Sequence, residues 1–145
     1  MKLPIKLIWV LSCKLKTAGK FVEIPTLNLK GYLFEENYIP RFKIENFDGR
    51  FSPDIFDIQV CEELLSHFDT LNRKRSKKLR RQYLGLTRSN SMFILVHVMV
   101  YASEKQFKAD FPEWTEFSVL LTDFRDKQKS LLYIVDVSEK MIGFY

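Results

Sequence analysis

The residues with the clearest chemical potential are seven basic side chains within nine positions, residues 73–81. The segment consists of Arg73, Lys74, Arg75, Ser76, Lys77, Lys78, Leu79, Arg80 and Arg81. Without these seven charges the 145-residue chain would hold 23 − 7 = 16 Lys and Arg against 18 Asp and Glu, a net charge of −2 instead of +5. The basic character of the protein is therefore local.

Such a basic run suits phosphate groups. Each phosphate that is neutralised on a nucleic acid releases counterions, so binding is favoured without any contact to a base. The four arginines add to this, because a guanidinium can bind two phosphate oxygens at once. The following segment, residues 87–91, adds a cation, hydroxyls and backbone amides of the kind that position a protein on a duplex. The sequence therefore predicts contact with the phosphate backbone of DNA or RNA through Arg73, Lys74, Arg75, Lys77, Lys78, Arg80, Arg81 and Arg88.

Two other interpretations of the run remain open. Residues 54–72 carry five acids and no Lys or Arg, so an acidic start and a basic end would also suit the dipole of a solvated helix. Alternatively, the basic helix could bind an acidic protein, as in an adaptor or inhibitor. Aromatic residues are dense between Tyr32 and Phe56; core packing explains them more simply than base stacking, although an exposed one such as Tyr38 could anchor a protein.

Enzyme chemistry has less support. His67 and His97 have no third ligand at metal-binding spacing, and Cys13 and Cys61 match no metal or redox motif. We expect no catalytic residue, no metal and no cofactor, with a nuclease-like site at Asp136 as the third interpretation. Two lone thiols favour a reducing compartment, the cytoplasm, or the nucleus in a eukaryote. No stretch approaches the roughly 18 apolar residues of a membrane span.

The elements that must position the basic run begin with an antiparallel sheet. Apolar and β-branched segments predict strands at residues 5–15, 21–24, 28–34 and 41–47. A helix follows, with Ser52 as its cap, Pro53 in its first turn and apolar residues every three or four positions. If this helix ran from 53 to 84 it would be about 48 Å long. A domain of this size is about 40 Å wide, so we expect a break or kink near residues 70–72.

The second half of the chain predicts a β-α-β unit. Residues 92–101 form an almost wholly apolar segment, typical of a strand covered on both faces. Ser103 and Gln106 have capping-box spacing, and a second helical segment starts near Pro112. Residues 131–137 predict another buried strand, and a strand, helix and strand normally form a parallel crossover. Ser103, Glu104 and Asp136 would then meet at one edge of the sheet.

The sequence as a whole predicts one α+β domain over residues 1–145: a mainly antiparallel N-terminal sheet, a long amphipathic helix with a basic C-terminal part, and a β-α-β unit. We expect a cytoplasmic, non-enzymatic nucleic-acid-binding or accessory subunit that works with other proteins in a larger assembly and not at a membrane. One basic helix end offers little to specify a base sequence by itself.

Overall fold

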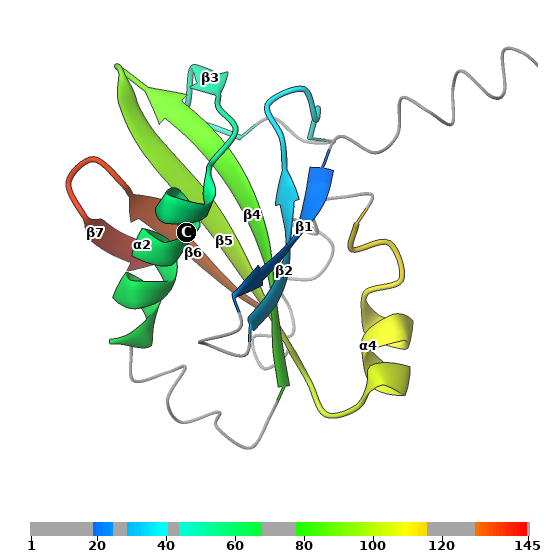
Figure 1. The fold of residues 1–145 in the computed structure, drawn as a ribbon. Helices are drawn as coiled ribbons and strands as arrows, with labels where there is room; N and C mark the ends of the chain where they lie inside the picture. Colours follow the sequence, from blue (N-terminus) through cyan, green and yellow to red (C-terminus); the bar gives the residue numbers. More distant parts are fainter. Residues whose placement is uncertain (1–18, 25–28, 41–43, 68–77, 116–129, 145) are drawn as a thin grey trace, which may run out of the picture.

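The computed structural model describes residues 19–24, 29–40, 44–67, 78–115 and 130–144, and within them the chain forms one mixed sheet with a helix on each face (Figure 1). The strands are β1 (Gly19–Ile24), β2 (Leu29–Phe34), β3 (Gly49–Arg50), β4 (Lys78–Arg88), β5 (Ser91–Tyr101), β6 (Ser130–Asp136) and β7 (Met141–Phe144). The helices are α2 (Ile55–Ser66) and α4 (Glu104–Asp110).

The sheet has the strand order β1-β2-β4-β5-β6-β7, and the short β3 pairs with the end of β4. Strands β4 to β7 form an antiparallel meander, and β1 and β2 form an antiparallel pair. The two parts are joined by parallel pairing of β2 with β4, in which Lys30 lies beside Arg80. Among the described strands, β1 and β7 are therefore the two outer ones.

A tight turn joins β4 to β5, the longest strands in the described part of the chain. Ser89 and Asn90 both have positive φ, 49° and 66°, as a two-residue type I′ turn requires. Asp48 fixes this turn, because its carboxylate accepts from the Ser89 amide at 3.0 Å and from the Thr87 hydroxyl at 3.2 Å. The turn sets the register in which Gln82 faces His97.

The two helices pack on opposite faces of the sheet. On one face, Ile58, Cys61 and Leu65 of α2 lie in the same core cluster as Tyr83 of β4 and Val96 of β5. On the other face, Phe107 of α4 packs with Met99 and Tyr101. Successive residues of a strand point to opposite faces, so the middle strands are buried on both sides. This arrangement confirms the prediction of a strand at 92–101 that is covered twice.

The long amphipathic helix of the prediction is wrong. Helix α2 begins after Asp54, whose side chain accepts from the Asp57 amide while that of Asp57 accepts from the Asp54 amide, each at 2.9 Å. Ser52 is not the cap; its hydroxyl accepts from the Glu36 amide instead. The helix ends at Ser66, and residues 78–84, predicted as its basic end, belong to β4. The expected kink at 70–72 lies outside the described residues.

The predicted β-α-β unit is also wrong. Strand β6 pairs with β5 in the antiparallel direction, so the segment that contains α4 is not a parallel crossover. Residues 44–47, predicted as part of a strand, form a turn in which Asn46 has a φ of 67°. The strands near 21–24, 28–34 and 131–137 and the helix capped by Ser103 are confirmed. The predicted strand at 5–15 and the end of the second helical segment, residues 117–124, lie outside the described residues.

Candidate nucleic-acid interface

The eight residues predicted to bind phosphate do not form one surface. Arg73, Lys74, Arg75 and Lys77 lie outside the described residues. Lys78 begins β4 and Arg88 ends it, and ten residues of strand separate them by about 33 Å. Each of the described cations therefore has to be judged in its own surroundings.

Arg81 is buried and paired within the protein. Its side chain lies on the α2 face, 6% exposed, with Nε 3.1 Å from Glu62 Oε1 and Nη2 3.3 Å from Glu62 Oε2. The Tyr83 hydroxyl donates to the same carboxylate at 2.8 Å. Burial and the Glu62 charge raise the pKa of Tyr83, so the phenol stays protonated and remains a donor. Arg81 stabilises the fold and has no surface from which to bind a ligand.

Arg80 lies on the opposite face and is held by α4. Its Nη2 makes two hydrogen bonds to the Glu104 carboxylate, at 2.8 and 2.9 Å. The guanidinium stacks over Phe107 at 4.3 Å and lies 5.3 Å from the rings of Tyr101 and Trp114. These cation–π contacts and the ion pair leave the side chain 15% exposed. Arg80 contributes charge near the surface, but its Nη2 is already paired with Glu104, and its buried Nε has no hydrogen-bond partner within the described residues.

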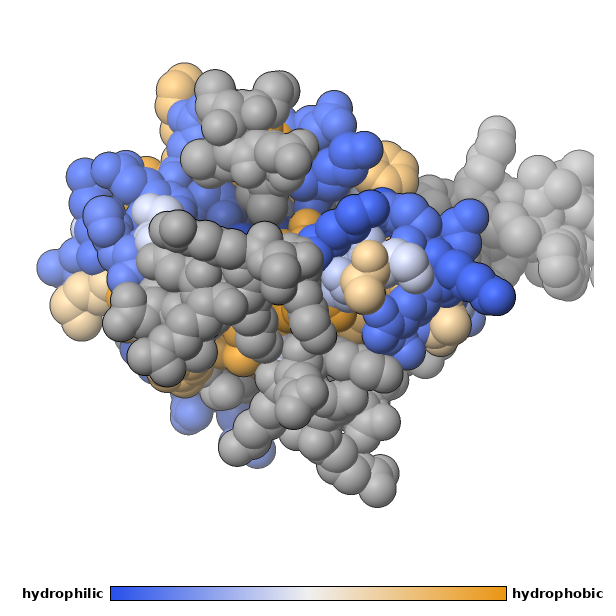
Figure 2. Space-filling model, turned by 90° about the horizontal axis from the view of Figure 1, so that it is seen from below, coloured by the Kyte–Doolittle hydropathy of each residue, from blue (hydrophilic) through white to orange (hydrophobic). Residues whose placement is uncertain are grey.

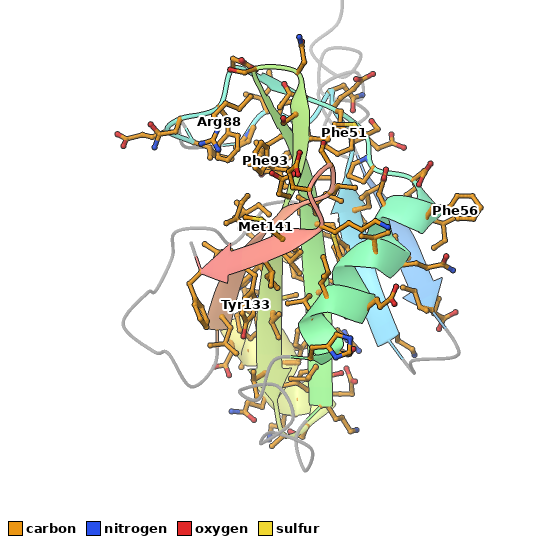
Figure 3. All side chains as sticks on the ribbon, turned by 90° about the vertical axis from the view of Figure 1, so that its left-hand side faces the viewer. Phe51, Phe56, Arg88, Phe93, Tyr133 and Met141 are labelled. Atoms are coloured by element: carbon orange, nitrogen blue, oxygen red, sulfur yellow. The ribbon has the colours of Figure 1, made fainter. Side chains whose placement is uncertain are left out.

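Arg88 is exposed at the far end of β4, where its guanidinium lies 4.8 Å from the Phe93 ring and 5.5 Å from the Phe47 ring. Figure 3 shows Arg88 and Phe93 side by side at the end of the sheet. Asp48 is part of the same turn. This cation is therefore separated from the basic run by the length of the sheet and shares its surroundings with an acid.

Exposed lysines gather instead at the end of the sheet where β4 begins. Three elements contribute to this set, which we call the lysine end: Lys30 of β2, Lys78 of β4, and Lys105 and Lys108 of α4. Lys30 and Lys78 share the face of Arg80, and Lys78 lies opposite Tyr101, from which the chain continues into α4. Positions 105 and 108 are three apart, so they lie on one side of the helix.

No described acid forms an ion pair with any of these four lysines. Figure 2 views the molecule from below, where hydrophilic residues lie on the side of α4 and also on the opposite side. Sequence analysis missed Lys105 and Lys108, and the available signal was two cations three positions apart after the Ser103 cap.

Charge is segregated along the described chain. Residues 35–40 and 44–67, which include α2 and the loops before it, contain eight acids and one cation, Arg50. Residues 19–24, 29–34 and 78–115 contain eight Lys and Arg and four acids. Arg50 is also engaged, because it donates to the carbonyl oxygens of Gly85, Tyr38 and Glu35. Tyr38, considered earlier as an exposed anchor, is buried.

A polar chain crosses the buried face beneath α4. Gln82 Nε2 donates to the Trp114 carbonyl at 2.6 Å, which directs Gln82 Oε1 toward His97 Nδ1 at 2.9 Å. His97 Nδ1 must then carry the proton, and His97 Nε2 accepts from the Ser130 hydroxyl at 3.0 Å. Desolvation lowers the pKa of His97 to about 4, so the ring is neutral at pH 7. His97 is therefore a buried packing residue whose two ring nitrogens both have hydrogen-bond partners.

The arrangement proposed for a nuclease-like site does not occur. Because β5 and β6 are antiparallel, Ser103 and Glu104 follow one end of the sheet, while Asp136 lies opposite Phe93 at the other, about 26 Å away. Asp136 instead accepts from the Glu139 amide in a turn. The described residues contain no group of three His, Cys, Asp or Glu that could hold a metal ion. Cys61 is buried, and burial raises the pKa of its thiol.

Neither described helix is long and apolar enough to cross a membrane. Comparison with known proteins adds no relative: no protein-family model, no curated protein and no solved structure matches the chain. The chemistry of the lysine end, together with the basic segment that precedes it in the sequence, is therefore what the functional argument depends on.

Proposed function

We propose that the protein is a non-enzymatic subunit that binds the phosphate backbone of a nucleic acid through the lysine end. One observation carries the proposal: four exposed lysines, none in an ion pair with an acid of the described residues, come from three elements to the point where the basic run joins β4. Lysines held by separate elements of a folded sheet are already placed near one another, so less ordering entropy opposes binding than for a loose tail.

The distribution of charge favours the lysine end over the rest of the described residues as the binding site. Five cations and four acids belong to the segments around it, a net charge of 5 − 4 = +1, from Lys30, Lys78, Arg80, Lys105 and Lys108 against Glu23, Glu104, Asp110 and Glu113. Arg73, Lys74, Arg75 and Lys77 precede Lys78 directly in the sequence and add four positive charges. Residues 35–40 and 44–67 have a net charge of 1 − 8 = −7. This polarity would orient an approaching polyanion.

Salt dependence and charge-matched variants test the proposal. The site variant replaces Lys78, Lys105 and Lys108 by Gln; the control variant replaces Lys20, Arg88 and Lys140 by Gln, so both have a net charge of 5 − 3 = +2. Fluorescence polarisation would follow binding of labelled DNA and RNA oligonucleotides between 50 and 300 mM salt.

We expect the site variant to lose about two units of the slope of log K against log salt, at about 0.7 for each phosphate of a single strand. That slope corresponds to up to about 100-fold weaker binding at 0.1 M salt. The control should retain both slope and affinity. Equal losses in the two variants, or no binding by the wild type at low salt, would refute the proposal.

A protein partner is the rival that the same experiment distinguishes. If the lysine end binds an acidic protein, polyglutamate should compete with the oligonucleotide as well as an unlabelled oligonucleotide of equal charge does. We propose that other proteins of the assembly contact the acidic segments, residues 35–40 and 44–67, in which Ile39 is 85% and Phe56 71% exposed. Figure 3 shows Phe56 projecting away from the molecule, whereas Phe51 points inward. A cytoplasmic location, or a nuclear one in a eukaryote, suits this proposal.

A further inference from the structure

Phe21 is the most exposed aromatic side chain of the described residues, at 73%. It belongs to β1, an outer strand of the sheet, so no further strand of the described chain flanks it. It makes T-shaped contacts with two rings: Tyr32, with centroids 5.2 Å apart and planes at 82°, and Trp114, at 5.9 Å and 66°. The Phe21 side chain therefore packs on two neighbouring rings while most of its surface faces solvent.

The register of the sheet places Phe21 beside the lysine end. Phe21 pairs with Tyr32, and Lys30 is two residues before Tyr32 on the same face of β2, a diagonal neighbour at about 7–8 Å. Lys78 lies two residues before Arg80, the partner of Lys30 in β4. Four residues along the strands and two strand spacings put Phe21 and Lys78 about 16 Å apart. A short oligonucleotide could reach both.

Resting on the proposed function, we propose that the ligand is single-stranded nucleic acid, and that one unpaired base stacks on Phe21 while neighbouring phosphates contact Lys30 and Lys78. The bases of a duplex are stacked on one another and do not offer a free face, whereas every unpaired base does. An exposed aromatic ring beside a row of cations is the arrangement by which proteins bind single strands without base preference. Glu23 lies opposite Lys30 and is an acid on this path.

The experiment compares ligands that differ only in their bases. A labelled 12-nucleotide thymidine strand and an abasic strand of equal length carry the same phosphates, and a 12-base-pair duplex and a uridine strand complete the set. Wild-type protein should bind the thymidine strand about 5- to 150-fold more tightly than the abasic one, the effect of stacking one base. The uridine strand should behave like the thymidine strand if the sugar is not recognised.

The variant Phe21→Leu removes the ring and keeps an apolar side chain, and Phe56→Leu is its control because Phe56 is equally exposed but belongs to α2. Phe21→Leu should reduce binding of the thymidine strand to the level of the abasic strand and leave the abasic strand unaffected. Phe56→Leu should change neither. Circular dichroism melting would establish that both variants fold.

The outcomes separate the two proposals. If wild-type protein binds the thymidine strand, the abasic strand and the duplex equally, the stacking inference is wrong while phosphate binding stands. If it binds none of them at low salt, the proposed function itself is wrong. The comparison of ligands needs only wild-type protein. It therefore tests both the stacking inference and the proposed function even if a variant fails to fold.

Discussion

Mild acid should destabilise the protein through a single buried side chain, His97. Desolvation lowers its pKa from 6.5 to about 4, so the unfolded chain takes up a proton at a higher pH than the folded one does. The stability that neutral His97 contributes is therefore complete above about pH 6.5 and falls as the pH drops toward 4. A difference of about 2.5 units corresponds to about 3 kcal/mol once the pH is well below 4, and to about 2 kcal/mol at pH 5.

Urea unfolding at a series of pH values between 7.5 and 4.5 would measure this loss. Carboxylates also titrate as the pH falls, so the informative quantity is the difference between wild type and His97→Gln, which cannot be protonated. We expect wild type to lose about 2 kcal/mol more than the variant between pH 7.5 and pH 5. His67→Gln is the matched control, because His67 is the exposed C-cap of α2, and it should follow wild type.

One result would refute the reasoning directly. If wild type and His97→Gln lose the same free energy of unfolding over this range, then protonated His97 is tolerated in the folded state. The ring would then have access to water, and its hydrogen bonds with Gln82 and Ser130 would not form a closed, dry chain.

Three changes to the fold have expected costs. Glu62→Ala should lower the free energy of unfolding by about 3–5 kcal/mol, since it leaves the Arg81 charge buried without its partner; urea denaturation measures this, and a cost below 1 kcal/mol would contradict it. Gly85→Ala should cost about 1–3 kcal/mol or more, because an added Cβ would collide with the backbone oxygen of Phe51; thermal melting checks it, and an unchanged Tm would show that the strand can move. Asp54→Ala should cost about 1 kcal/mol by removing the cap of α2; equal urea midpoints would assign the cap no role.

Local sequence signals predicted the elements whose conformation is determined by residues close by in the sequence. Strand β5 is an almost wholly apolar segment, and α4 starts at Ser103, whose hydroxyl accepts from the Gln106 amide at 3.2 Å. The paired strands near 21–24 and 28–34 were likewise visible as short apolar or β-branched segments. In each case the signal and the structure that it specifies lie within about ten residues of one another.

Strand β4 could not be predicted in this way. Its Lys, Arg, Gln and Leu residues favour helix in isolation, and Leu79, Tyr83 and Leu86 match the spacing of a helical stripe. What makes it a strand is tertiary: Arg81 pairs with Glu62, 19 residues earlier, and Gln82 donates a hydrogen bond to the carbonyl of Trp114, 32 residues later. These partners are too far away in the sequence for a local pattern to reveal them, so helix propensity predicted the wrong element.

The candidate site was predictable only in part for the same reason. The basic run indicated where positive charge enters the domain, but alternation along β4 directs Arg81 into the α2 core and Arg80 under α4. Lys105 and Lys108 reach the same end only because the β4–β5 turn brings Tyr101 opposite Lys78. Sequence composition therefore located the positive charge, while strand register decides which of the basic side chains are available to bind a ligand.

The parallel pairing of β2 with β4 has a consequence for the order of folding. Strands β4 and β5 of the meander are joined by a turn of only two residues, Ser89 and Asn90. By contrast, Lys30 of β2 and Arg80 of β4 are 50 residues apart in the sequence when they pair. Closing that long loop costs entropy that the early contacts do not repay. We therefore expect the β1–β2 hairpin to join the sheet last and to open first as a unit. Amide hydrogen exchange should be fastest there among the strands, and a ligand seated on Phe21 should slow it.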